Sequence, residues 1–150
     1  MKQIIGGAVL TLAALVAAGC SPQPDPDAVQ QWMTRQAAAA TDARAQMTGL
    51  ALKRSAVADR TVDELREQIR IDFDDPEPVR SVAFHCFGAD AMDLTLYVET
   101  PAGSVGAAAT DIRCADSPVT IDTGVSEPVE AMAVVAVDRD GVGAWAVVVE

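Results

Sequence analysis

The stretch that decides the fold is Asp93-Leu94-Thr95-Leu96-Tyr97-Val98-Glu99, in which apolar and polar side chains alternate. Strict alternation is typical of a β-strand that turns one face toward a core and the other toward solvent. In this arrangement Leu94, Leu96 and Val98 would face inward. We therefore expect these residues to form a half-buried strand.

Similar patterns lie on both sides of this strand. Val79–Phe87 places Val82, Phe84 and Cys86 on one face, and Gln68–Phe73 alternates before residues 74–78 end it with turn residues. Short strands separated by Gly, Pro and Asp turns favour a sandwich or a small barrel. We predict a mainly β fold, a small antiparallel β-sandwich of seven or so strands over residues 66–150. The further strands are expected at 107–114, 119–122, 132–137 and 144–149, the last two joined by a hairpin turn at 138–143.

A helical segment is predicted upstream, over residues 28–62. Asp27 is a suitable N-cap, and no proline interrupts the alanine-rich sequence that follows. Thr48-Gly49 weakens the helix, and Thr61 and Glu64 have the spacing of a capping box. The segment is expected to lie on its own domain or to stand as a stalk, with a partner-binding helix as the alternative. Its stripe of mostly small residues is Val29, Met33, Gln36, Ala40, Ala43, Met47 and Leu50.

The first 19 residues have the organisation of an export signal. Lys2 precedes an apolar run from Ile4 to Ala18, and small residues lead to Cys20. Ala17-Ala18-Gly19-Cys20 resembles the lipobox of bacterial lipoproteins, although Ala17 stands where that family favours a larger aliphatic residue. The resemblance implies cleavage after Gly19 and lipid on the sulfur and the new amino group of Cys20.

This resemblance implies an anchored, extracytoplasmic location. At least two acyl chains on Cys20 would hold the protein in the membrane, because each buried methylene contributes about 0.8 kcal/mol. Residues 20–27 hold three prolines at alternate positions and are expected to form an extended tether between the lipid and the domain. The expected location is the cell membrane, on its extracytoplasmic side.

Two cysteines remain once Cys20 carries lipid, namely Cys86 and Cys114. An even number of cysteines in an exported chain indicates a disulfide. The alternative is a reduced, reactive thiol, which an oxidising compartment disfavours. Residues 66–150, with Val82–Gly88 and Ile112–Cys114 among them, also loosely resemble small β-domains behind lipoboxes in high-GC Gram-positive bacteria. That resemblance supports the fold and implies no functional residues.

Charge excludes one class of partner. The chain has a net charge of −11, and residues 71–150 alone hold fifteen acids against three arginines. Such a domain repels phosphate backbones, so nucleic-acid binding is not expected. The charge also keeps a tethered domain soluble and away from an anionic membrane surface.

No constellation of residues supports catalysis, and we expect no enzyme, cofactor or metal site. His85, the single histidine, adjoins Cys86, but neighbours on a strand point to opposite faces, and zinc would need more ligands. The acids at 72–77 and the Asp138-x-Asp140-Gly141 motif indicate solvated turns rather than cation sites. Gly103 and Gly106 lack the lysine and the following helix of a phosphate-binding loop.

These features predict a lipid-anchored envelope protein whose β-sandwich is a non-enzymatic interaction module for a protein partner or a small ligand. A receptor component for a solute or glycan is the first alternative. A redox or hydrolytic enzyme is the second, and free thiols in the exported protein would favour it.

Overall fold

The alternating segment lies within the middle strand of a five-stranded sheet. The computed structural model describes residues 23–67 and 69–149, and in it β5 (Ala91–Thr100) pairs with β6 (Gly103–Arg113) and with β8 (Pro128–Asp138). Leu94, Leu96 and Val98 are at most 1% exposed, which confirms the predicted inward face. β2 (Leu52–Lys53) and β3 (Arg70–Pro78) both pair with β8 on its other side.

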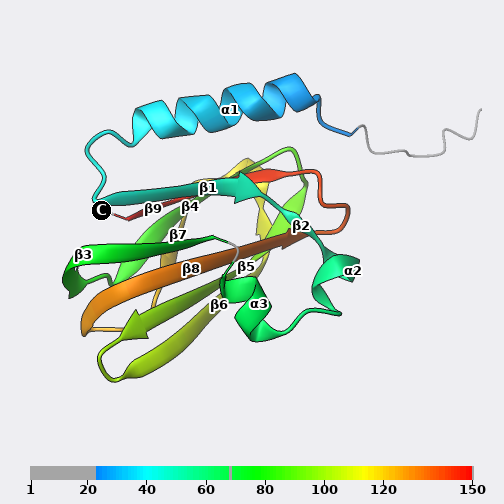
Figure 1. Ribbon diagram of the computed structural model, residues 1–150. Helices are drawn as coiled ribbons and strands as arrows, with labels where there is room; N and C mark the ends of the chain where they lie inside the picture. Colours follow the sequence, from blue (N-terminus) through cyan, green and yellow to red (C-terminus); the bar gives the residue numbers. More distant parts are fainter. Residues whose placement is uncertain (1–22, 68, 150) are drawn as a thin grey trace, which may run out of the picture.

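A second sheet packs against the first, so the fold is the predicted β-sandwich (Figure 1). It contains β1 (Ala45–Leu50), β9 (Ala144–Val149), β4 (Ser81–Phe87) and β7 (Val119–Asp122), in that order and all antiparallel. Between β6 and β7 lies the short 3-10 helix η1 (Cys114–Asp116). The core lies where the two sheets meet. Its largest fully buried side chains include Trp145, Phe84, Met92, Leu94, Leu96 and Met132.

The helix predicted over residues 28–62 is much shorter. α1 spans Pro26–Ala39, and its N-cap is Asp25 rather than Asp27, because the carboxylate of Asp25 accepts the Asp27 N–H at 2.9 Å. Pro26 suits the first helical turn, where its missing N–H costs nothing. Residues 54–57 and 62–66 form two further short helices, α2 (Arg54–Val57) and α3 (Val62–Arg66). The capping box of Thr61 and Glu64 at the start of α3 is confirmed.

The prediction of helix was wrong for residues 45–50, which form β1. This strand pairs along its whole length with β9, and Ala45, Met47 and Gly49 alternate inward. A Cβ on Gly49 would lie 2.8 Å from the Trp145 ring, so only glycine lets the two strands approach here. Pairing with a strand that is buried on both faces overrides the local helical pattern. The sandwich therefore begins before residue 66.

Three strands are longer than the sequence indicated. β3 continues to Pro78 through an irregularity between Asp72 and Glu77, and β8 begins at Pro128. β6 includes Gly103 and Gly106, which the sequence pattern had placed between strands, and it ends at Arg113 before Cys114. Each of these strands pairs with a long neighbour, β3 with β8 and β6 with β5. This pairing continues the strand beyond the alternating apolar residues that the sequence pattern identified.

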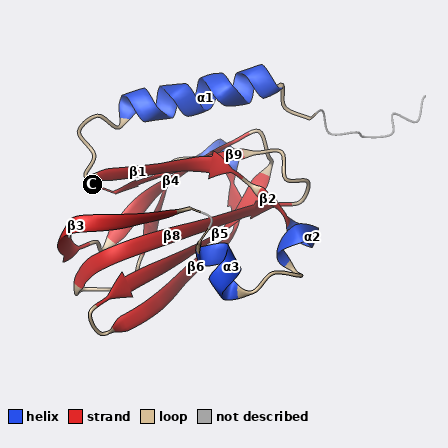
Figure 2. Ribbon diagram, viewed as in Figure 1, coloured by secondary structure: helices blue, strands red, loops and turns tan. Residues whose placement is uncertain are grey.

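Helices cover parts of both outer faces of the sandwich (Figure 2). α1 lies on the sheet that contains β9, where Val29 and Trp32 pack against Ala144 and Ala146. The Trp32 and Phe87 rings stack at 5.8 Å. α1 is thus laid along the domain rather than standing away as a stalk. On the other sheet, α3 contacts β8 and buries Leu65.

Candidate functional site

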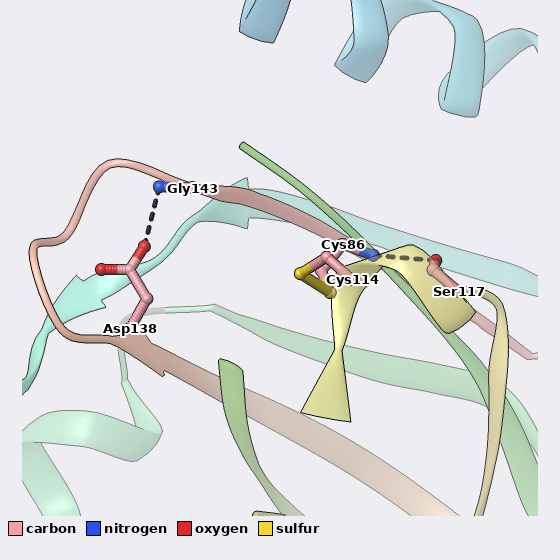
Figure 3. Close-up of a disulfide and its surroundings, with 5 residues drawn as sticks. All are labelled: Cys86, Cys114, Ser117, Asp138 and Gly143. Atoms are coloured by element: carbon pink, nitrogen blue, oxygen red, sulfur yellow. Dashed lines mark hydrogen bonds between the residues drawn. A yellow bond between two sulfur atoms is a disulfide. The ribbon is translucent and has the colours of Figure 1, made fainter. Parts of the chain in front are cut away.

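The predicted disulfide is present and joins the two sheets (Figure 3). Cys86 lies on β4 and Cys114 follows the last residue of β6, with their sulfurs 2.06 Å apart and their Cα atoms 5.1 Å apart. The Cys86 N–H donates to Ser117 Oγ at 3.1 Å. The disulfide joins residues 28 positions apart and so restricts the unfolded chain. In the chain-entropy model this restriction raises the free energy of unfolding by about 3–4 kcal/mol.

His85 forms no nucleophilic pair with its neighbour. Cys86 faces the core and is bonded to Cys114, whereas His85 pairs in register with Ala146, a residue under α1 on the outer face. Partial burial lowers the pKa of the His85 imidazole, because burial disfavours the charged ring. The structure therefore keeps the two side chains apart, as strand geometry predicts.

Asp138 is a buried carboxylate whose oxygens are used by the protein itself (Figure 3). They accept the backbone N–H groups of Asp140 at 2.7 Å, Gly141, Val142 at 3.1 Å and Gly143 at 2.8 Å. The carboxylate thus organises the β8–β9 turn from inside. The chain turns here, but the predicted hairpin was wrong, because β8 and β9 lie in different sheets and do not pair with each other. The aspartate of the calcium-like motif is engaged by backbone donors of this connection.

The acidic cluster at residues 72–77 is spread along β3 and held by arginines. Asp72 pairs with Arg70 at 2.8 Å, while Arg44 pairs with Glu77 at 3.7 Å and donates to the Asp75 carbonyl at 2.7 Å. The described residues contain no group of three or more His, Cys, Asp or Glu side chains placed to hold a metal ion.

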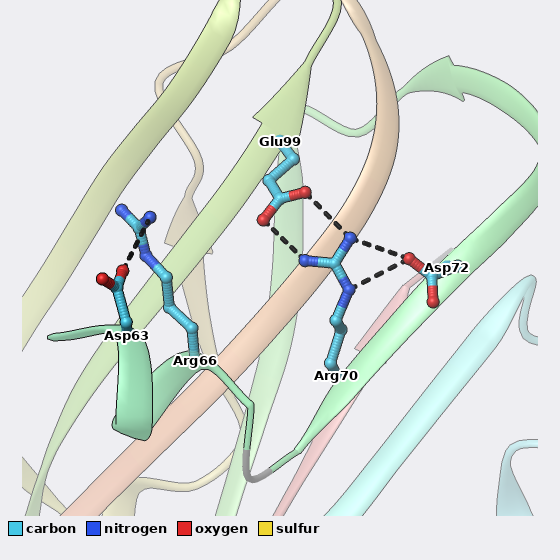
Figure 4. A network of polar contacts seen from close by, with 5 residues as sticks. All are labelled: Asp63, Arg66, Arg70, Asp72 and Glu99. Atoms are coloured by element: carbon cyan, nitrogen blue, oxygen red, sulfur yellow. Dashed lines mark hydrogen bonds and ion pairs between the residues drawn. The ribbon is translucent and has the colours of Figure 1, made fainter.

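An arginine network ties the outer face of the β5 sheet together (Figure 4). Arg70 on β3 forms a bidentate pair with Glu99 on β5, at 2.5 and 2.8 Å. The partners meet above β8 because small residues, Ala131 and Ala133, pair with them in register. Accepting hydrogen bonds from Arg70 lowers the pKa of the Glu99 carboxyl, and donating hydrogen bonds to Glu99 and Asp72 raises the pKa of the Arg70 guanidinium.

A second arginine of this face covers an aromatic ring. The Arg66 guanidinium lies 4.8 Å from the centre of the Tyr97 ring and 4.0 Å from Asp63. Arg66 and Arg70 both interact with neighbouring side chains of this chain. The charged groups of this face therefore connect α3 and β3 to β5 and are not free to bind a ligand.

Two shallow hollows lie on the described surface. One of about 330 Å³ lies along the start of β4, lined by residues 78–83 and by Thr120 of β7. Another lies along α1, lined by Asp27, Gln30, Gln31, Thr34 and Arg35. Both are open to solvent, whereas sites for small molecules enclose most of the ligand. Neither hollow favours a receptor function.

The free edge of β6 is the feature that the sequence pattern missed. Residues 103–106 are exposed, Val105 at 39%, and within the described ranges β6 pairs with β5 alone. The sequence shows one unusual feature here, since residues 103–110 form an uncharged run of eight within an acidic domain. Such a run carries no marker of a strand edge, so it did not reveal that one side stays unpaired.

Cys20 and residues 1–19 lie outside the described residues, so the predicted cleavage and lipidation stay predictions. No helix in the described part of the chain is long and apolar enough to cross a membrane. Comparisons with protein-family models, with curated proteins and with solved structures found nothing that matches this chain.

Proposed function

We propose that the protein is a lipid-anchored module of the cell envelope that binds another polypeptide through its β-sandwich and carries out no chemistry. The observation that carries this proposal is the edge of β6, with which no other strand of the described residues pairs, and its exposed and uncharged residues 103–106. Free strand edges readily pair with further chain, and proteins usually cover or charge them. An edge left open on an acidic, soluble domain is best explained by a partner.

The location rests on two features of the chain. The disulfide supports an oxidising, extracytoplasmic compartment, since such bonds are rare in reducing ones. The lipobox-like junction at Cys20 supports an anchor there. The tether predicted over residues 20–27 is shorter than expected, because Pro26 and Asp27 already belong to α1. α1 begins at Pro26, six residues after Cys20, so the anchor would enter the domain on the α1 side.

The experiment is site-specific photo-cross-linking in living cells. A photoreactive residue at Val105 on β6 is expected to form a product with a second polypeptide. The matched control is Gln31, an exposed residue on α1, which is expected to form none. Products from Gln31 alone, or none from either position, would contradict the proposal.

A further inference from the structure

The edges of the two sheets are not equally open to an added strand. β2 has two residues and β7 four, and β3 is interrupted between Asp72 and Glu77 and contains two prolines. β1 has six residues, with Arg44 directly before it. β6 has eleven, and between Gly103 and Thr110 it carries no proline and no charge. Within residues 23–67 and 69–149, the part of β6 from Gly103 to Ala109 therefore lacks the devices that protect the other edges, and the irregularity and charges of β6 come only after it.

The backbone of β6 offers free hydrogen-bonding groups in a regular array. Thr100 and Gly103 close a two-residue turn, and their register with β5 continues through Ala109. Alternate residues of an antiparallel edge strand turn both backbone groups outward. The backbone N–H and C=O groups of Gly103 in the closing pair point toward β5. The backbone groups that point away from β5 therefore belong to Ser104, Gly106 and Ala108.

The side chains of this edge also suit a neighbour. Val105 pairs with Val98 and so faces the core side, yet it is 39% exposed, while Val98 is fully buried. On this side of the sandwich the opposite sheet ends with the four-residue β7, whereas β6 has eleven residues, and residues 103–106 at the start of β6 are exposed. An added strand would cover Val105 and Ala107 on the inner face with its own apolar residues.

Charge at the two ends of the edge is negative. At one end, Asp111 follows the uncharged run directly. At the other end, beside the start of β6, the Glu127 carboxylate accepts a hydrogen bond from the Thr100 hydroxyl at 3.3 Å. The one cation of β6, Arg113, is engaged by Asp116 at 2.6 Å. Since residues 71–150 carry twelve net negative charges, the surroundings favour a cationic partner.

We infer that the β6 edge takes up an extended, cationic polypeptide segment as an additional strand of the β5 sheet. Apolar residues at alternate positions of that segment cover Val105 and Ala107, and the lysines or arginines between them face outward, near Asp111. This inference rests on the proposed function and specifies the chemistry of its partner.

A second copy of this chain is a poorer occupant. Each chain carries a net charge of −11, so two edges brought together repel each other. Self-association would also place the acids at the ends of one edge near those of the other. The acidic surroundings of the β6 edge therefore favour a basic segment over a second copy of this acidic chain.

The test uses three synthetic peptides of eight residues and the full oxidised chain. The first alternates valine and lysine, the second groups the four valines before the four lysines, and the third replaces lysine by glutamate. The alternating cationic peptide is expected to bind about tenfold more tightly than the grouped one, and added salt should weaken it. It should slow amide hydrogen exchange at Ser104, Gly106 and Ala108.

Two pairs of variants place the binding site. Ala108→Pro removes an outward N–H at an edge position that tolerates proline, and it should abolish peptide binding, while Ala108→Thr should retain it. Val105→Lys adds a cation at the edge and should weaken binding about tenfold. Val62→Lys makes the same change at an exposed valine of α3 and should leave binding unchanged.

Several results would overturn the inference. These are equal binding of the alternating and grouped peptides, unchanged binding by Val105→Lys, or slowed exchange at β1 in place of β6. Concentration-dependent dimers that protect the β6 amides would identify a second copy as the occupant and equally refute it. If cross-linking from Val105 still captures a partner, the proposed function survives the failure of this inference.

Discussion

Asp138 illustrates how a polar residue in this core serves the fold. Its carboxylate is 2% exposed and accepts four backbone N–H groups of the β8–β9 turn. Buried carboxylates are costly unless their oxygens are fully used, and here the turn itself supplies the donors. The acidic residue therefore stabilises the connection between the two sheets.

Replacing Asp138 should destabilise the protein strongly. Asp138→Asn leaves one acceptor oxygen and aims an NH₂ group at backbone donors, so the free energy of unfolding should fall by about 3 kcal/mol. Asp140→Asn, in the same turn but exposed, is the control and should change little. Urea unfolding measures both, and equal effects of the two changes would show that the Asp138 hydrogen bonds do not hold the turn.

His85 should make stability depend on pH. Burial lowers its pKa below 6.5, so the folded state favours the neutral ring while the unfolded chain takes up the proton. Stability from this residue is present above about pH 6.5 and is lost as the pH falls toward the lowered folded value. The melting temperature of the wild type relative to His85→Gln should therefore drop between about pH 7.5 and pH 5. A constant difference between the two proteins would contradict this assignment.

Among single residues, the sequence predicted the roles of those whose role depends on strand geometry alone. The Cys86–Cys114 bond and the separation of His85 from Cys86 followed from cysteine count and from the alternation of side chains. The role of Asp138 did not follow, because it depends on the directions of backbone N–H groups, which composition and spacing leave open.

The elements show where local patterns failed. Residues 45–50 were predicted as helix because they follow alanine-rich sequence and because Met47 and Leu50 continue its stripe at helical spacing. They form β1 because β9, buried on both faces, has one side unpaired without it. The predicted strands at 79–87 and 144–149 were correct, since their own side chains specify burial. A strand specified mainly by its partner is not visible in its own sequence.

The position of β1 sets the smallest unit that folds. A fragment of residues 66–150 lacks the buried residues Ala45, Met47 and Leu65 and leaves β9 unpaired on one side. It should aggregate or bind dyes that report an exposed core. A fragment of residues 43–150 keeps β1 and should melt cooperatively, with α1 absent. Cooperative melting of residues 66–150 at the same temperature would show that β1 contributes nothing essential.

In the whole molecule, the disulfide and the net negative charge agree with the proposal of an extracytoplasmic interaction module. One disulfide ties the sheets, α1 covers part of one outer face, and residues 71–150 carry twelve net negative charges. The sequence predicted this sandwich class and its bond. The open β6 edge emerged only from the assembled sheets, because an edge is defined by what does not pair with it.

The most direct test of this account is mass spectrometry of the mature protein, isolated from membranes without reducing agent and alkylated. The account predicts Cys20 as the first residue, carrying at least two acyl chains, and a peptide pair joined through Cys86 and Cys114 with neither thiol alkylated. Residues 1–19 still attached, or an unmodified Cys20, would contradict the anchor. Alkylated Cys86 and Cys114 would contradict the disulfide and favour an enzyme with reactive thiols.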